Sequence, residues 1–322
     1  MRHFFSTITL AAGLVAGSFS AAYAEKEVVF AHVFAANSLE QEAAGVFAQK
    51  VAEYSNGELK VTIFPASQLG GWAQIATQQR SGAVNATIIS TSALGSFSSL
   101  ATVDAWPYIF DTREQFDRAY SSDEGKAFFK AIEDESGYRA LSPMYKGFRN
   151  VYLRGDASDL KGQKIRVPGL PVVLRSFESW GASPTPMDMA EIYTAMQQGV
   201  VDGIEIEAQT AQAAGMPDVT KTVLMTRHMM PNYAFIFFGA WLDQLPEGER
   251  VAIEKASADA STFFAEKIAV AEEEAIKFFA AKGASVKEAD LDAMRKQVEG
   301  LATEFPAEYE WVKRLRAAAG MN

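Results

Sequence analysis

The feature of this sequence that most constrains its fold is an alternation of short apolar segments with segments of helical spacing. The spacing of apolar residues predicts helices over 37–55, 72–81, 172–180 and 188–198. Short apolar or alternating segments predict strands at 27–31, 59–64, 86–90, 164–167 and 200–204, with an extended segment at 183–187. From residue 246 onward the pattern is almost entirely helical. This alternation is typical of α/β layers with parallel strands.

Two segments of the chain also resemble each other. Residues 75–85 read IATQQRSGAVN and residues 192–202 read IYTAMQQGVVD, so Ile, Thr, Gly and Val coincide and Asn aligns with Asp. Each copy is predicted to be a helix, a glycine stop and a strand. Chance is one explanation of so short a match. The other is a pair of related α/β lobes, an architecture that commonly closes around a ligand held in the crevice between them.

The first 24 residues have the layout of a secretory signal peptide. A charged start at Arg2 precedes a short apolar run at 8–17, and residues 22–24 (AYA) give the small-x-small cleavage pattern. A membrane anchor or a buried first helix is the alternative, but the run is shorter than the ~20 apolar residues that a membrane span needs. We expect cleavage near Ala24 and a periplasmic protein, unlipidated because no cysteine stands at the cleavage site.

Composition excludes several classes of function. The 322 residues include no cysteine and three histidines, which excludes Cys-ligated zinc, iron–sulfur clusters and thiol nucleophiles and disfavours a multi-histidine metal site. The net charge of −10 disfavours a nucleic-acid partner, because phosphate binding needs basic surface. The sequence also lacks the motifs of phosphate loops, dinucleotide-binding folds, serine hydrolases and zinc proteases. We therefore expect a binding protein rather than an enzyme.

Two arginines on predicted strands are candidate anchors for an anionic ligand. Arg166 lies between Ile165 and Val167, and alternation places its side chain on the face opposite to theirs. An arginine held on a rigid strand suits two-point recognition of a carboxylate. Arg149 lies on another predicted strand and has the same potential role. The alternative for each is an ordinary surface ion pair.

Acidic residues gather at the end of the strand predicted after Gly199. Asp202, Glu205 and Glu207 could hold a ligand hydroxyl or amine there, or a cation through their oxygens. The alternative is that they stabilise the N-terminus of a following helix. We expect no cofactor. A cation that is bound by Glu205 and Glu207 together with the ligand stays an open alternative.

Four further residues are candidate ligand contacts. Ser90 ends a predicted strand, His32 follows another, and Trp72 follows a Gly-Gly loop. Tyr233 is the fourth, although most aromatic residues are expected to pack in the core or between the lobes. For His32 the alternative is a hydrogen-bonded structural histidine.

The stretch from residue 160 to residue 205 resembles the substrate-binding proteins of tripartite ATP-independent periplasmic (TRAP) transporters, the DctP family. The resemblance is carried by LKGQKIRVP at 160–168, GASPTPM at 181–187 and EIYTAMQQGVVDGIE at 191–205. Weaker matches are AH at 31–32, FPASQLG at 64–70 and WLDQLP at 241–246. Together they extend over essentially the whole chain after residue 24.

The resemblance implies a two-lobed α/β fold, like that of periplasmic binding proteins, with hinge strands and a long helix packing along both lobes. After a signal peptide at 1–24, we expect lobe I to comprise 25–145 plus about 232–270. Lobe II would comprise about 146–231 plus 271–322.

The resemblance also implies capture of a small organic carboxylate and its delivery to the membrane permease subunits. Arg166 matches the family arginine that pairs with the ligand carboxylate, and Arg149 matches a second arginine that assists it. Ile206, Gly169 and Met189 depart from residues common in acidic-sugar and dicarboxylate binders, so contacts to the rest of the ligand should differ. We expect the protein to be mostly monomeric, and a dimer stays an open alternative.

Two other functions remain open at this point. The chain could be an exported ligand-binding subunit that serves a sensor or another transporter type. More remotely, it could be a periplasmic enzyme acting on a sugar acid, which would need a catalytic acid–base pair in the crevice.

Overall fold

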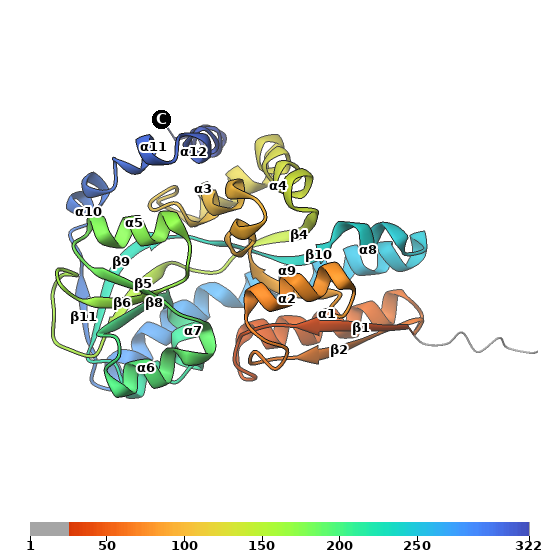
Figure 1. Cartoon of the computed structure of the whole chain (residues 1–322). Coiled ribbons are helices and arrows are strands. Elements are labelled where there is room, and N and C mark those ends of the chain that lie inside the picture. Colours follow the sequence, from red (N-terminus) through yellow and green to blue (C-terminus); the bar gives the residue numbers. More distant parts are fainter. Residues whose placement is uncertain (1–25, 322) are drawn as a thin grey trace, which may run out of the picture.

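The computed structural model describes residues 26–321, and its strands form two sheets that lie side by side (Figure 1). The predicted signal peptide at 1–24 lies outside the described residues. The first sheet has the order β2-β1-β3-β10-β4 and the second has the order β11-β9-β5-β8-β6-β7. The two sheets with their covering helices are called lobe I and lobe II below.

The strands of lobe I are β1 (Lys26–Ala31), β2 (Leu59–Phe64), β3 (Ala86–Ser90), β4 (Tyr138–Tyr145) and β10 (Asn232–Phe238). Those of lobe II are β5 (Arg149–Leu153), β6 (Lys164–Val167), β7 (Ser183–Pro186), β8 (Gly203–Glu207), β9 (Thr222–Met229) and β11 (Ser285–Glu288). The prediction of parallel strands is correct for β1 with β2 and β3, and for β6 with β7 and β8. It is incomplete, because β10 runs antiparallel to β3 and β4, and β5 runs antiparallel to β8 and β9.

Helices cover both sheets. They are α1 (Leu39–Tyr54), α2 (Trp72–Ser81), α3 (Arg113–Ser121), α4 (Asp123–Ser136), α5 (Pro171–Ser179), α6 (Ile192–Gln198), α7 (Ala208–Ala213), α8 (Gly239–Gln244), α9 (Glu247–Ala281), α10 (Leu291–Gln297), α11 (Leu301–Glu304) and α12 (Pro306–Ala318). Short 3₁₀ helices are η1 (Thr91–Ser96), η2 (Ser99–Ala105), η3 (Met189–Glu191) and η4 (Met216–Asp218). In residues 26–321, no helix combines the length and apolar character needed to cross a membrane.

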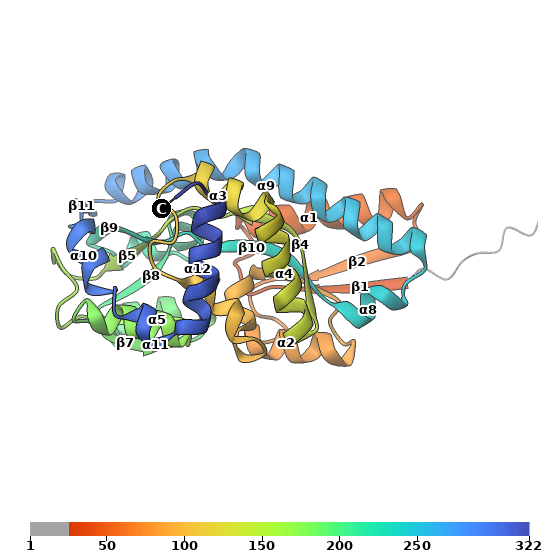
Figure 2. The same cartoon turned by 90° about the horizontal axis from the view of Figure 1, so that it is seen from above.

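The chain passes between the lobes in short connections and along one long helix. Only residues 146–148 separate β4 from β5, and only 230–231 separate β9 from β10. The 35-residue helix α9 packs against α1 and β4 of lobe I and against α7 and β11 of lobe II. Figure 2 shows it running along the length of the molecule. The two lobes are therefore interleaved in sequence, and residues near the short connections can face the gap between them.

The C-terminal helix does not follow the lobe expected for residues 271–322. α12 contacts η2, α3 and α4, all of which are elements of the lobe I segment. Its aromatic residues explain this placement, because Tyr309 packs on Trp106 and Trp311 packs on Phe128. The exact boundaries of the lobes stay a prediction, but α12 covers lobe I.

The two similar segments have the same structure. Helices α2 and α6 each end at a glycine in the left-handed conformation, Gly82 with φ 78° and Gly199 with φ 75°. The aligned Asn85 and Asp202 have equivalent contacts. Asn85 accepts a hydrogen bond from the backbone N–H of Val29, and Asp202 accepts one from the backbone N–H of Lys164. A short polar side chain just before the strand thus joins it to the next strand in both lobes.

The later strand starts three residues beyond the predicted one. We expected 200–204, whereas β8 comprises Gly203–Glu207. The left-handed turn at Gly199 leaves Val200 exposed. The Asp202 side chain accepts a hydrogen bond from the Lys164 N–H just before the strand pairing of β8 begins. The prediction of an almost wholly helical segment after 246 also missed β11, which is a short edge strand beside β9.

Candidate ligand site between the lobes

A small cavity of about 30 Å³ lies between the lobes, and residues of both line it. Lobe I and the connection to it contribute Phe34, Trp72, Ser90, Ser92, Pro231 and Tyr233. Lobe II contributes Arg149, Arg166, Pro168, Leu170, Met189, Ile206 and Met229. A second cavity of about 430 Å³ shares five of these residues, namely Trp72, Arg166, Pro168, Leu170 and Met189. We call the two cavities together the interlobe site.

Arg166 lies on β6 and is a buried cation with few partners. Its side chain is only 6% exposed, and its Nε and Nη2 donate to the carbonyl of Met187 at 2.9 and 2.6 Å. Two of its five N–H groups are thereby used. No carboxylate of residues 26–321 forms an ion pair with it. Burial, together with the nearby charge of Arg149, lowers the pKa of Arg166 to about 10, so it stays cationic at neutral pH and its remaining N–H groups are available to an anion.

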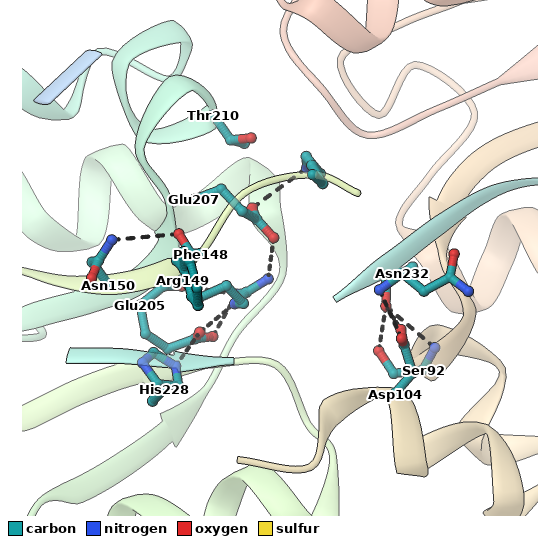
Figure 3. Close-up of polar contacts among 12 residues, drawn as sticks. Ser92, Asp104, Phe148, Arg149, Asn150, Glu205, Glu207, Thr210, His228 and Asn232 are labelled. Carbon is teal, nitrogen blue, oxygen red and sulfur yellow. Dashed lines mark hydrogen bonds and ion pairs between the residues drawn. The ribbon is translucent and has the colours of Figure 1, made fainter. Parts of the chain in front are cut away.

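Arg149 lies on β5 and is already paired with two glutamates of β8. Its guanidinium contacts the Glu205 carboxylate at 2.6 Å through Nη2 and the Glu207 carboxylate at 3.1 Å through Nη1 (Figure 3). Glu205 and Glu207 are two residues apart on one strand, so both side chains lie on the face that meets Arg149 across the β5–β8 ladder. Burial disfavours the charged form of Glu205, but Arg149 outweighs it and lowers the pKa of Glu205 to about 2.

A second buried cation joins this cluster to lobe I. Lys146 has no exposed side-chain surface, and its Nζ lies 2.8 Å from Glu40 of α1 and 3.4 Å from Glu207 of β8. Nζ also lies 3.9 Å from the centre of the Tyr233 ring. Burial lowers the pKa of Lys146, but Glu207 and Glu40 outweigh it and raise the pKa above its ordinary value. The short connection between the lobes therefore carries a charge that both lobes share.

His228 on β9 completes the cluster around Glu205. Its Nε2 lies 3.3 Å from Glu205 and its Nδ1 lies 2.8 Å from the hydroxyl of Thr226. Burial lowers the pKa of His228, so the ring is neutral at pH 7. Glu205 and Glu207 thus have protein partners and do not line the cavity. In the part of the chain that the structure describes, no group of three His, Asp or Glu residues is arranged to hold a metal ion.

On the lobe I side, two serine hydroxyls form a hydrogen-bonded chain that ends at the buried carboxylate of Asp104. Ser90 donates to Asp104 at 2.7 Å, and the hydroxyls of Ser90 and Ser92 are 2.6 Å apart. Because an ionised Asp104 can only accept, Ser92 must be the donor to Ser90. Burial raises the pKa of Asp104 to about 6, and donors from Ser90, Asn232 and Tyr120 limit the rise. At neutral pH the Ser90 hydroxyl is therefore fully used, since it donates to Asp104 and accepts from the hydroxyl and the N–H of Ser92, and only Ser92 keeps free lone pairs.

Trp72 and Tyr233 also line the cavity. Trp72 is the first residue of α2, and its indole N–H is buried without a hydrogen-bond partner in residues 26–321. The Tyr233 ring lies between the cavity and the Lys146 ammonium. Two aromatic side chains therefore line the same cavity as Arg166, and one of them has an uncommitted N–H donor.

The structure does not bring His32 to this cavity. Its Nδ1 accepts from the Phe34 N–H at 3.2 Å, and its Nε2 bonds the side chain of Gln41 at 2.8 Å. The ring is buried between Phe30 and Phe34, and burial lowers its pKa. The physical reason is that His32 is held within lobe I by both ring nitrogens, as expected of a hydrogen-bonded structural histidine.

Sequence reasoning missed several residues of the site. Phe34, Leu170, Met229 and Pro231 are apolar residues of strand ends and connections, and nothing in their spacing distinguishes them from core residues. Lys146 and Asp104 were missed because burial, which gives them their importance, is not visible in sequence. A signal for Lys146 did exist, since it stands directly before the segment that contains Arg149.

Comparisons with known proteins agree with this architecture. A family model described as bacterial extracellular solute-binding protein, family 7 (DctP), matches residues 30–308. The sialic acid-binding periplasmic protein SiaP of Vibrio cholerae is 28% identical over 271 residues, covering 83% of this chain and 84% of that protein. The C4-dicarboxylate-binding periplasmic protein DctP of Rhodobacter capsulatus is 29% identical over 258 residues, covering 79% and 77%.

A solved structure is similar over nearly the whole length. The sugar acid binding protein DctPAm from Advenella mimigardefordensis, in complex with galactonate, is 27% identical and has a TM-score of 0.87. The similarity covers 92% of this chain and 98% of that one. These relatives are solute-binding proteins and not enzymes. The chain belongs to the DctP family of bacterial extracellular solute-binding proteins.

Proposed function

We propose that this solute-binding protein captures a small organic carboxylate at the interlobe site, with Arg166 as the anchor. The observation that carries the proposal is a buried arginine with uncommitted N–H groups and no carboxylate partner within residues 26–321. A buried cation of this kind is costly unless an anion neutralises it. The ligands named for the relatives, sialic acid, C4-dicarboxylate and galactonate, all carry a carboxylate.

Arg149 has a different part in this proposal. Its guanidinium is engaged by Glu205 and Glu207, so it supports the wall of the cavity and contributes a compensated charge. Arg166 lacks such compensation and therefore supplies the net attraction for the ligand. Ser90, Trp72 and Tyr233 would complete the contacts from lobe I.

The binding step follows from the electrostatics. With the lobes apart, Arg166 is hydrated; a carboxylate that docks exchanges that water for a charge-assisted hydrogen bond. When the lobes close, water leaves and the lower local dielectric strengthens the bond. The closed shape is then available for recognition by a TRAP permease in the membrane, to which the protein delivers the ligand. Export through the signal peptide at 1–24 would place it in the periplasm, mostly as a monomer.

Substitution of Arg166 tests the anchor. Removing one partner of a desolvated charged pair costs ~2–5 kcal/mol, or roughly 30- to 5,000-fold in affinity. Arg166→Ala should weaken carboxylate binding by that factor in isothermal titration calorimetry. Arg166→Lys should recover only part, because an ammonium lacks the planar fork of a guanidinium.

The matched control is a surface arginine that makes ordinary ion pairs. Arg175 is 51% exposed on α5 and pairs with Glu304 and Glu178, so Arg175→Ala should leave affinity unchanged. A folded Arg166→Ala protein that binds the carboxylate as tightly as the Arg175→Ala protein would disprove the anchor.

A further inference from the structure

The lining of the interlobe site carries information about the part of the ligand beyond its carboxylate. In the smaller cavity, nine of the thirteen lining residues are apolar or aromatic: Phe34, Trp72, Pro168, Leu170, Met189, Ile206, Met229, Pro231 and Tyr233. No asparagine, glutamine, aspartate or glutamate of residues 26–321 lines it. Asn232 lies between Pro231 and Tyr233, but alternation along β10 turns its side chain to the opposite face from Tyr233.

The polar groups that do reach this cavity are few and have limited capacity. Arg149 is occupied by two carboxylates, and Arg166 has already donated to Met187. The uncommitted donors are the remaining N–H groups of Arg166 and the indole N–H of Trp72. Of the two serines, only Ser92 offers free lone pairs, because Ser90 donates to Asp104 and accepts from the hydroxyl and the N–H of Ser92. The donors suit one carboxylate, and Ser92 suits one hydroxyl group.

In the smaller cavity, a polyhydroxylated chain does not match this inventory. Each ligand hydroxyl that is buried against apolar side chains without a partner loses its hydrogen bonds to water and gains none in return. The lobe II lining of this cavity includes Leu170, Met189 and Ile206, whose aliphatic or thioether side chains cannot pair with such hydroxyls. Apolar ligand surface is instead stabilised when these residues remove it from water.

The larger cavity adds a constraint on charge. Its lining includes Asp188 and Glu191, which form a reciprocal cap at the start of η3. Arg166 lines both cavities, and it is the cation that would pair with the ligand carboxylate. The two carboxylates of the larger cavity would repel a second negative charge on the ligand.

We propose that the ligand is a small monocarboxylate with an apolar body, aliphatic or aromatic, that carries at most one hydroxyl group. This inference rests on the proposed function and narrows its substrate class. It excludes sugar acids and dicarboxylates as the preferred ligands of this chain. Leu170, Met189 and Ile206 are the residues that set this preference, since they supply the apolar wall of lobe II, while Phe34 and Trp72 supply that of lobe I.

The experiment compares matched carboxylates on the purified mature protein by isothermal titration calorimetry at two temperatures. The probes are 4-methylpentanoate, 2-hydroxy-4-methylpentanoate and phenylacetate against galactonate, glucuronate and succinate. We expect at least one apolar monocarboxylate to bind tenfold or more tightly than every sugar acid and succinate. Its binding heat should become more favourable as temperature rises, because burial of apolar surface gives a negative heat-capacity change.

A pair of leucine variants localises the effect. Leu170 and Leu174 are both partly buried and one helical turn apart, but only Leu170 lines the site. Leu170→Asn should weaken binding of the apolar monocarboxylate by ~10- to 100-fold, whereas Leu174→Asn should leave it unchanged. Circular dichroism and melting temperatures of both variants check that each is folded.

The outcomes separate this inference from the proposed function. If galactonate, glucuronate or succinate binds more tightly than every apolar monocarboxylate, the inference is overturned and carboxylate capture stands. If Leu170→Asn and Leu174→Asn have equal effects on affinity, the assignment of Leu170 is overturned. If none of the six carboxylates binds, both the inference and the proposed function fail.

Discussion

At the scale of single residues, burial determines the chemistry of this site. Glu205 and Asp104 are both fully buried carboxylates, yet their pKa values are shifted in opposite directions. Glu205 faces the Arg149 guanidinium, which favours its charged form. Asp104 has only neutral donors, so the cost of burial dominates. The first carboxylate fixes a cation beside the cavity, and the second orders the serine hydroxyls on the other side.

Asp104 predicts a specific pH dependence of stability. Its folded pKa of about 6 exceeds the ordinary 3.8, so between these values the folded state binds a proton that the unfolded state does not. Its contribution to stability therefore falls as pH rises from about 4 to 6 and is constant above that range. Relative to Asp104→Asn, the wild type should gain about 2 kcal/mol of unfolding free energy between pH 7 and pH 4.5.

Urea unfolding of both proteins at several pH values measures this difference. The variant is expected to be less stable at every pH. Its amide NH2 group replaces one of the two Asp104 oxygens, which accept hydrogen bonds from Ser90, Tyr120 and the Asn232 N–H. Only the pH dependence of the difference bears on the prediction. A difference that stays constant from pH 7 to 4.5 would show that Asp104 titrates normally in the folded protein.

At the scale of secondary structure, the start of β8 is the element that the sequence misplaced and the packing explains. Gly203 pairs with Leu153 on β5 and with Ile165 on β6. A Cβ at residue 203 would lie 2.6 Å from Leu153 Cδ2, 2.9 Å from Ile165 Cδ1 and 2.9 Å from the Tyr152 carbonyl. Three neighbours from two strands therefore require glycine where β8 enters the sheet, and β8 carries Glu205 and Glu207.

Substitution of Gly203 should consequently destabilise the protein. Gly203→Ala forces the backbone of β8 away from β5, and overpacking of this kind costs ~1–3 kcal/mol. Gly248 is the matched control, since it lies in the first turn of α9 and a Cβ added there would meet nothing within 4 Å. Gly248→Ala should be neutral or stabilise by up to ~1 kcal/mol. Guanidinium unfolding measures both, and equal stability of the two variants would contradict the packing described for β8.

At the scale of the whole molecule, charge and helix α9 connect the two lobes. Lys146 joins Glu40 of lobe I to Glu207 of lobe II, and Thr210 of α7 reaches Glu40 at 3.3 Å. Close by, Glu272 of α9 accepts from the Tyr145 hydroxyl and the Phe148 N–H on either side of the connection. The hinge region is thus held by buried ion pairs and hydrogen bonds to residues of both lobes.

Lys146 should be essential for stability. Lys146→Met leaves Glu40 without a cation, whereas Glu207 keeps Arg149, and an uncompensated buried charge costs ~3–5 kcal/mol. Lys267 is the control, because it pairs with Glu42 at 2.7 Å while 50% exposed, and exposed pairs contribute ~0–1 kcal/mol. In urea unfolding, Lys146→Met should lose most of its stability and Lys267→Met almost none. If Glu40→Gln added to Lys146→Met restored nothing, buried charge would not be the cause.

Much of the fold follows from local patterns in the sequence. Apolar spacing located α1, α2 and α5 and strands β1 to β3, and glycines at 82 and 199 marked helix ends. The pair Asn85 and Asp202 was visible as an alignment, although its role as a strand connection was not. Antiparallel β10 and edge strand β11 could not be predicted, because strand direction and pairing depend on contacts between distant residues.

The sequence by itself determined the family and the α/β lobes and singled out Arg166 as a candidate anchor, because motifs and periodicity are local properties of the chain. Only the tertiary structure decided which charges are already paired. Arg149 and Arg166 look equivalent in sequence, but Glu205 and Glu207 compensate the first and leave the second available. The apolar character of the site was likewise decided by tertiary structure, because its lining comes from strand ends and connections far apart in the chain, and burial depends on how these segments meet.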